Sequence, residues 1–158
     1  MDPQHNTPLK GGAMKSLLML LARCMLCAVF LAAAAQKILH WEATSVQLKQ
    51  LGLEMIPLLL AGAIAVEMIG ALSLLIGSWT RTGAFVLLLF MIPTTLLFHD
   101  FWTLTGEAMS EQLHLFLSNC GIMGGLLYVM ANGPGRFSRD HGRRRTRSST
   151  EDSEYDEE

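Results

Sequence analysis

The sequence predicts an all-α membrane protein, a four-transmembrane-helix bundle with a short interfacial helix in the first loop. The 158 residues are 51% apolar and only 16% charged, whereas a soluble domain carries about 25% charged residues. Four segments are also apolar enough, at about 20 residues, to cross a lipid bilayer. This composition excludes a nucleic-acid-binding domain, a disulfide-rich secreted domain and a water-soluble enzyme, and makes the lipid bilayer the first partner of the chain.

The four predicted spans are residues 16–35, 56–77, 82–98 and 113–131, so the transmembrane domain covers residues 16–132. Pro57 suits the first turn of the second span, where a missing N–H costs nothing. The fourth span ends at Gly133-Pro134-Gly135. Ala33-x-Ala35 resembles a signal-peptide cleavage site, but Arg23 and the length of the apolar run favour an uncleaved first helix.

The first loop, residues 36–55, is long enough to hold the short helix. Thr44 is the expected N-cap of that helix, and Gly52 is the residue expected to end it. Trp41 and Trp102 are expected at the outer membrane interface, where indole rings prefer to lie.

Basic residues near the ends of the spans predict the orientation. Lys10, Lys15, Arg81 and the six arginines of residues 136–147 lie on one side, against Lys37 and Lys49 on the other. This excess of nine to two places both termini in the cytoplasm. Residues 1–15 are then a cytoplasmic tail. Residues 133–158 form a second cytoplasmic tail, basic and then acidic, with too few apolar residues to fold, so we expect it to be disordered.

Small residues at four-residue spacing mark the expected helix contacts, because they let membrane helices approach closely. The first span has such a stripe at Cys24, Ala28, Ala32 and Ala35. Shorter stripes are Ser73 with Gly77 in the second span and Gly121 with Gly125 in the fourth.

Arg23 and Glu67 are the only charged residues within the predicted spans. An ionised group at mid-membrane costs about 2.5–3.5 kcal/mol, so it usually faces the bundle interior and has a partner there. The two residues have similar estimated depths, and we expect them to interact directly or through Asn119. Such an intramembrane polar pocket would serve a proton, an anion or a quinone. The alternative is an ion pair that only fixes the register of the helices.

Cys24 and Cys27 form a C-x-x-C motif, the spacing of redox-active thiols. Thiolates are disfavoured in hydrocarbon, and an intact helix places the side chains of i and i+3 poorly for a disulfide. A structural role is therefore favoured over a redox role.

A polar cluster is expected at the outer interface, formed by His99, Asp100, Trp102 and His114. Imidazole and carboxylate groups together relay protons or bind metals. The spacings typical of a metal site are missing, so we favour interfacial packing and expect no metal.

Several short motifs resemble the DoxX family of small four-span bacterial membrane proteins. They extend from the arginine of the first span to Asp140, and their order and spacing are specific. In chain order they are Arg23 with Phe30-Leu31 and Lys37, Glu67-x-x-Gly70, Gly77-x-x-Thr80-Arg81, His99-Asp100-Phe101-Trp102, Phe116-Leu117-Ser118-Asn119, Gly124-Gly125-Leu126-Leu127 and Gly133-x-Gly135-Arg136-x-Ser138-x-Asp140.

The resemblance implies a multi-pass protein of the bacterial inner membrane. Family members are similar to membrane subunits of a thiosulfate:quinone oxidoreductase and to membrane partners in thiol-redox complexes. We therefore expect a non-catalytic accessory subunit that docks a soluble or membrane oxidoreductase, with a quinone as the one cofactor to consider and a homo-oligomer as an open question. The alternatives are a membrane oxidoreductase acting through a quinone or thiols and, third, a small-solute transporter.

Overall fold

The computed structural model describes residues 9–135 and 137–140. Four of its helices, α1, α3, α4 and α5, are long and apolar enough to cross a membrane, which confirms the predicted all-α membrane bundle. Of the tail predicted to be disordered, residues 133–158, residues 136 and 141–158 lie outside the described residues, whereas Pro134, Phe137 and Asp140 are hydrogen-bonded to the bundle. The elements are α1 (Leu9–Leu39), α2 (Trp41–Gln50), α3 (Ile56–Ile76), α4 (Thr80–Phe98), the 3₁₀ helix η1 (Phe101–Thr103) and α5 (Gly106–Asn132).

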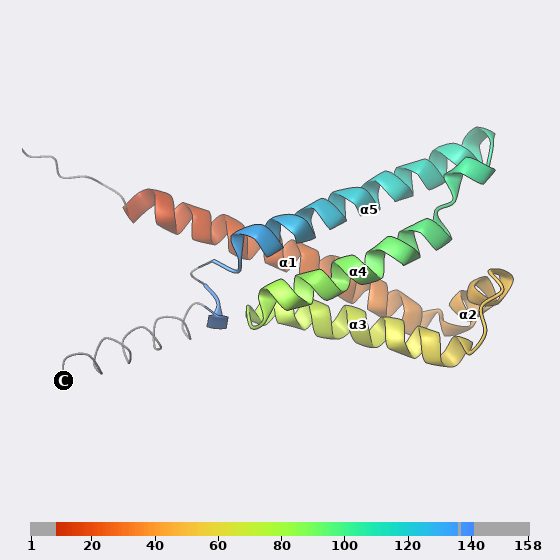
Figure 1. The fold of residues 1–158 in the computed structure, drawn as a ribbon, viewed down its shortest axis with the longest axis horizontal. Helices are drawn as coiled ribbons and strands as arrows, with labels where there is room; N and C mark the ends of the chain where they lie inside the picture. Colours follow the sequence, from red (N-terminus) through yellow and green to blue (C-terminus); the bar gives the residue numbers. More distant parts are fainter. Residues whose placement is uncertain (1–8, 136, 141–158) are drawn as a thin grey trace, which may run out of the picture.

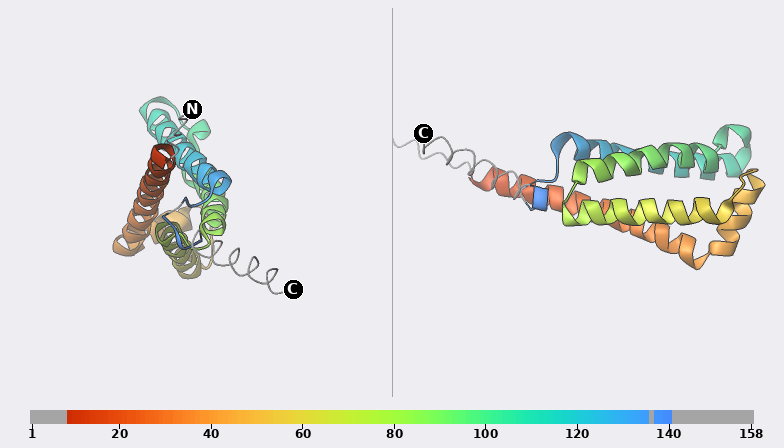
Figure 2. Two further views of the ribbon diagram at one scale, coloured as in Figure 1. Left: turned by 90° about the vertical axis from the view of Figure 1, so that its left-hand side faces the viewer. Right: turned by 60° about the horizontal axis from the view of Figure 1, so that its bottom comes forward.

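The four long helices run lengthwise, each antiparallel to the next along the chain (Figure 1). Helix α1 packs on α3, α3 on α4 and α4 on α5, while α1 crosses α5 obliquely (Figure 2). The first half of α1, the turn between α3 and α4 and the residues after α5 lie together at what we call the termini end. Helix α2 and η1 lie at the opposite end, the loop end.

The short helix expected in the first loop is α2. Thr44 is not its N-cap: the helix begins at Trp41, and the Thr44 hydroxyl donates to the carbonyl of His40 one turn earlier. Gly52 ends the helix as expected, with a φ of 73°. The N–H groups of Gly52 and Leu53 donate to the carbonyls of Lys49 and Leu48, the pattern of a Schellman cap.

The outer helices extend beyond the spans predicted from apolar residues. Helix α1 begins at Leu9 and continues to Leu39, and α5 begins at Gly106 instead of near Leu113. The apolar run marks only the part of a helix that lies in hydrocarbon. Polar residues can extend the same helix into the membrane interface. As a result, Lys37 belongs to α1 and not to the first loop.

Helix α4 continues through Pro93. A proline removes one backbone donor from a helix. The hydroxyl of Thr94 donates to the carbonyls of Phe90 and Met91, at 3.0 and 3.1 Å, beside the interruption. The missing N–H of Pro93 would have donated to the carbonyl of Leu89, so the Thr94 hydroxyl bonds to the neighbouring carbonyls and does not replace it.

The core lies where all four long helices meet. Its buried side chains are Leu26, Cys27, Phe30, Ala71, Leu74, Ala84, Leu87, Met91, Leu126 and Val129. On α1 the inward face is therefore the one that carries Cys27 and Phe30. The predicted contact stripe of the first span is wrong: Ala28, Ala32 and Ala35 are exposed, because they lie on the opposite side of the helix.

Helix α5 contributes little to this core. Leu126 and Val129 are its buried residues in the described structure, and both lie in its last two turns. A Cβ atom built on Gly121 meets nothing within 4 Å, whereas one on Gly125 contacts Leu26 at 3.3 Å. Of the predicted Gly121–Gly125 stripe, only Gly125 therefore lies at a close contact with α1.

The turn from α3 to α4 depends on Gly77. Its φ is 71°, a region that side chains with a Cβ rarely adopt, and its N–H donates to the carbonyl of Ser73. A Cβ at this position would lie 2.5 Å from Nη2 of Arg23 and 2.6 Å from Cβ of Ser138. Both the backbone conformation and the space therefore require glycine here.

We predict that Gly77→Ala destabilises the protein by more than about 1 kcal/mol, because alanine strains a positive φ and crowds Arg23. The matched control is Gly62→Ala on α3, where a new Cβ meets nothing within 4 Å. Unfolding of both variants in detergent measures the difference. Equal stability of the two variants would show that the turn tolerates a side chain.

Candidate functional site

The Arg23 guanidinium is the most deeply buried charge of the described structure, with 1% of the residue exposed. Its Nε donates to the carbonyl of Leu74 at 2.7 Å and its Nη2 to that of Leu75 at 2.9 Å. Its Nη1 donates to the carbonyls of Pro134 and Phe137, at 2.8 and 3.0 Å. One side chain of α1 thus binds both the last turn of α3 and the segment after α5.

These contacts follow from the ends of helices. The last carbonyls of a helix have no partner within it, and together they form the negative end of its dipole. Leu74 and Leu75 occupy this position in α3, and the forked guanidinium supplies several donors to them at once. Arg23 therefore acts as a C-cap for α3.

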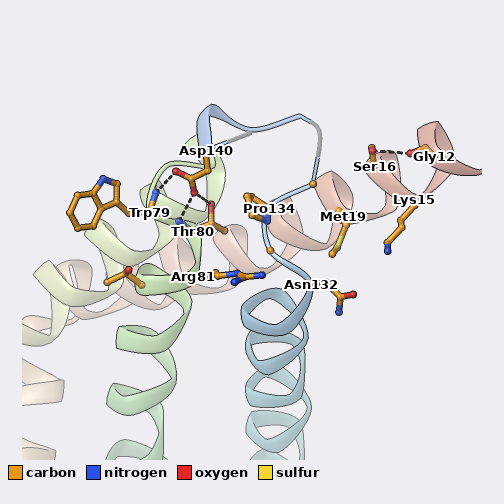
Figure 3. Close-up of a pocket in the computed structure, with 13 residues that line it drawn as sticks. Gly12, Lys15, Ser16, Met19, Trp79, Thr80, Arg81, Asn132, Pro134 and Asp140 are labelled. Atoms are coloured by element: carbon orange, nitrogen blue, oxygen red, sulfur yellow. Dashed lines mark hydrogen bonds between the residues drawn. The ribbon is translucent and has the colours of Figure 1, made fainter. Parts of the chain in front are cut away.

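The start of α4 is capped by Asp140, a residue that comes about 60 positions later in the chain. One carboxylate oxygen of Asp140 accepts from the N–H of Trp79 at 3.0 Å, and the other accepts from the N–H and hydroxyl of Thr80, both at 3.1 Å (Figure 3). The N–H of Asp140 donates to the carbonyl of Gly77 at 3.0 Å. An acidic side chain at a helix N-terminus is favourable for the same electrostatic reason.

The predicted contact between Arg23 and Glu67 is wrong. Glu67 pairs with Lys37: Nζ of Lys37 lies 2.7 Å from Oε1 of Glu67. Arg23 instead reaches Leu74, seven residues beyond Glu67 and about 10 Å further along α3. The two depths differ because Arg23 lies level with the last turn of α3, since α1 begins at Leu9 and extends past the predicted start of its span. Lys37, expected in the first loop, is a residue of α1.

Lys37 reaches Glu67 by running back along its own helix. Side chains of an α-helix lean toward its N-terminus, and Nζ of Lys37 also lies 3.5 Å from the carbonyl of Ala33, one turn earlier. The Glu67 side chain is 5% exposed and that of Lys37 25%. The carboxylate of the pair therefore lies in the bundle interior, and the lysine side chain is partly exposed at the surface of α1.

Glu67 keeps one free acceptor. Oε2 is buried and has no hydrogen-bond partner in the described part of the chain. A buried carboxylate oxygen without a donor is costly. The arrangement can accept a hydrogen bond at Oε2, while the ammonium of Lys37 has more protons than the Glu67 bond uses.

The third member of the predicted pocket, Asn119, lies apart from the other two. Its amide Nδ2 donates to the hydroxyl of Thr95 on α4 at 3.2 Å, and Thr95 is 2% exposed. Arg23, Glu67 and Asn119 therefore have three separate sets of partners.

The sequence does carry a signal for Lys37 as a site residue. Arg23, Phe30 and Lys37 follow one another at seven-residue spacing and so lie on one face of the helix.

At the loop end the members of the predicted outer cluster contact other residues, and no described hydrogen bond or ring contact joins two of them. Nδ1 of His99 lies 2.8 Å from Oε1 of Gln112, and Asp100 accepts from the hydroxyl of Thr103. Trp102 packs edge-on against Phe101 and Phe116. His114 is exposed. Among the described residues, no three His, Cys, Asp or Glu side chains lie together as metal ligands would.

Cys24 and Cys27 are both free thiols, Cys24 half-buried and Cys27 buried in the core. They lie on one continuous helix, which keeps side chains at i and i+3 poorly placed for a disulfide. Their redox role stays a prediction.

We predict that Lys37 and Glu67 are energetically coupled and that Arg23 and Glu67 are not. The double variant of Lys37→Met and Glu67→Gln should lose about 0.5–3 kcal/mol less than the two single losses together, because the groups are in contact. Arg23→Lys combined with Glu67→Gln should be additive to within about 0.5 kcal/mol. Unfolding free energies in detergent check both cycles, and coupling in the second alone would contradict the geometry.

The chain has relatives among known proteins. Over 129 residues the chain is 28% identical to the inner membrane protein YphA of Escherichia coli, covering 82% of this chain and 92% of that protein. Over 123 residues it is 32% identical to the inner membrane protein YqjF of the same organism, covering 77% and 88%. No solved structure gives a significant match. The DoxX family profile matches residues 18–100, and the chain belongs to the DoxX family.

Proposed function

We propose that this protein is an accessory subunit of a redox complex in the bacterial inner membrane, and that it holds a quinol or quinone headgroup at the Lys37–Glu67 pair. The observation that carries the proposal is the buried Oε2 of Glu67, an acceptor without a donor. Its relatives YphA and YqjF are named as inner membrane proteins, which supports the location.

The two residues match the two oxidation states of such a headgroup. A quinol hydroxyl donates hydrogen bonds, and Oε2 of Glu67 accepts them. A quinone carbonyl accepts them, and the one proton of the Lys37 ammonium that neither Glu67 nor the Ala33 carbonyl uses can donate to it. Oε1 of Glu67 is held at 2.7 Å by Lys37, so the carboxylate is oriented before a ligand arrives.

Access from the lipid supports the same site. A quarter of the Lys37 side chain is exposed, near the loop end of α1. A lipid-soluble headgroup therefore meets the ammonium first, and it reaches the buried Oε2 of Glu67 only when the side chains around that oxygen move. In this proposal the pair supplies hydrogen bonds and charge, and the docked oxidoreductase supplies the electrons.

We predict that Glu67→Gln weakens quinol binding about tenfold or more and changes quinone binding much less. The amide replaces the free acceptor by a donor, and a hydrogen bond to a charged group contributes about 1.5–3 kcal/mol. Titration of the protein in lipid nanodiscs with a short-chain quinol and its quinone measures both affinities. Glu111→Gln, an exposed position of α5, is the matched control. Unchanged quinol affinity in a folded Glu67→Gln protein would refute the headgroup site.

The partner is tested separately. Affinity purification of the tagged protein from native membranes, followed by mass spectrometry, should recover an oxidoreductase in stoichiometric amount. Recovery of the protein alone, under conditions that keep other membrane complexes intact, would count against an accessory role.

The orientation is part of the proposal: both termini face the cytoplasm. Basic residues near the termini end outnumber those near the loop end, and cytoplasmic loops carry such an excess. Reporter fusions at Glu158 and in the segment between α4 and α5 should give opposite signals, with the carboxyl terminus cytoplasmic. A periplasmic signal at Glu158 would reverse the assignment.

A further inference from the structure

A cavity of about 560 Å³ lies at the termini end, away from the Lys37–Glu67 pair. Its walls come from the first half of α1, the start of α4 and the residues that follow α5. In Figure 3, Lys15 of α1, Arg81 of α4 and Asn132, the last residue of α5, lie around this space. Ser16, Met19 and Gly133 also line it.

Two basic side chains that line this cavity have N–H groups without an acceptor among the described residues. Lys15 is exposed and has no hydrogen-bond or ion-pair partner in the described part of the chain. Arg81 makes one hydrogen bond there, from Nη2 to the carbonyl of Ala131 at 3.2 Å. Asp140 also lines the cavity, but its carboxylate oxygens accept from Trp79 and Thr80. The cavity thus offers an anion two basic side chains.

A second cavity, of about 510 Å³, adjoins the first and shares Lys15 and Met19 with it. The residues that it adds are mostly apolar: Met14, Leu18, Ala22 and Tyr128. From Met14 to Ala22 it follows α1 for about two turns toward the middle of the bundle. A polar compartment at the end of the bundle therefore continues into an apolar groove along a membrane-spanning helix.

We propose that these two cavities form a binding site for one anionic phospholipid. Its phosphate lies between Lys15 and Arg81, and one acyl chain lies in the groove beside Leu18, Ala22 and Tyr128. Guanidinium and ammonium groups pair well with phosphate oxygens, and basic pockets between membrane helices bind anionic headgroups. The apolar groove distinguishes a lipid from a free phosphate, because only a lipid fills both compartments.

The site is tested with the full-length protein in phosphatidylcholine nanodiscs, into which phosphatidylglycerol is titrated. Bound lipid is counted by native mass spectrometry, and the thermal midpoint is followed in parallel. Lys15→Gln and Arg81→Gln should each weaken phosphatidylglycerol binding about fivefold, which is the effect of one basic residue at a membrane surface. The two changes together should weaken it about thirtyfold. Lys49→Gln, which removes one exposed positive charge at the loop end, should leave it unchanged.

Two further arms identify the ligand. Inorganic phosphate at the same concentration should not raise the thermal midpoint; a rise that the Lys15→Gln/Arg81→Gln variant abolishes would overturn the lipid in favour of a soluble anion. Ala22→Trp fills the groove and leaves the charges, and should weaken lipid binding while its midpoint in pure phosphatidylcholine stays close to that of the parent protein. Equal phosphatidylglycerol affinity of the parent and the double variant would overturn the site altogether.

Discussion

The bond between the Arg23 guanidinium and backbone carbonyls organises the termini end of this bundle. A buried cation normally needs an acidic partner or a set of fixed dipoles. Here the dipoles are the carbonyls of Leu74 and Leu75 at the end of α3 and those of Pro134 and Phe137 after α5. The three segments must lie where these carbonyls converge. The position of α1 against α3, and of the chain that leaves α5, follows from this requirement.

Charge inside the membrane is handled in two different ways along the same face of α1. Near the termini end the Arg23 cation is stabilised by backbone carbonyl dipoles, and near the loop end Lys37 is paired with the carboxylate of Glu67. The residues between them on this face, Cys27, Phe30 and Ala34, are apolar and buried. The first arrangement uses its donors on fixed backbone, whereas the second leaves one carboxylate oxygen open. This difference gives Arg23 a structural role and is the reason why we place the proposed headgroup at the Lys37–Glu67 pair.

The fold could be predicted from sequence because lipid imposes simple rules on length and hydropathy. Four apolar segments require four helices, and the burial of Arg23 and Glu67 follows from the cost of charge in hydrocarbon. Their partners could not be predicted in the same way. Backbone carbonyls carry no sequence signal, so the acceptors of Arg23 were not visible. The partner of Glu67 was missed because Lys37 lies past the last apolar residues of the first span, although its spacing from Arg23 places both on one face.

The cap that Asp140 places on α4 also says something about the order in which the protein is completed. Asp140 lies 60 residues beyond Thr80, whose N–H and hydroxyl it accepts, and Pro134 and Phe137 come almost as late. A ribosome makes all four long helices before it makes these residues. While the 60 residues from Thr80 to Asp140 are made, the N-terminus of α4 lacks its carboxylate cap and Arg23 lacks two of its four carbonyl acceptors. The termini end can close only when the chain's final described residues have been made.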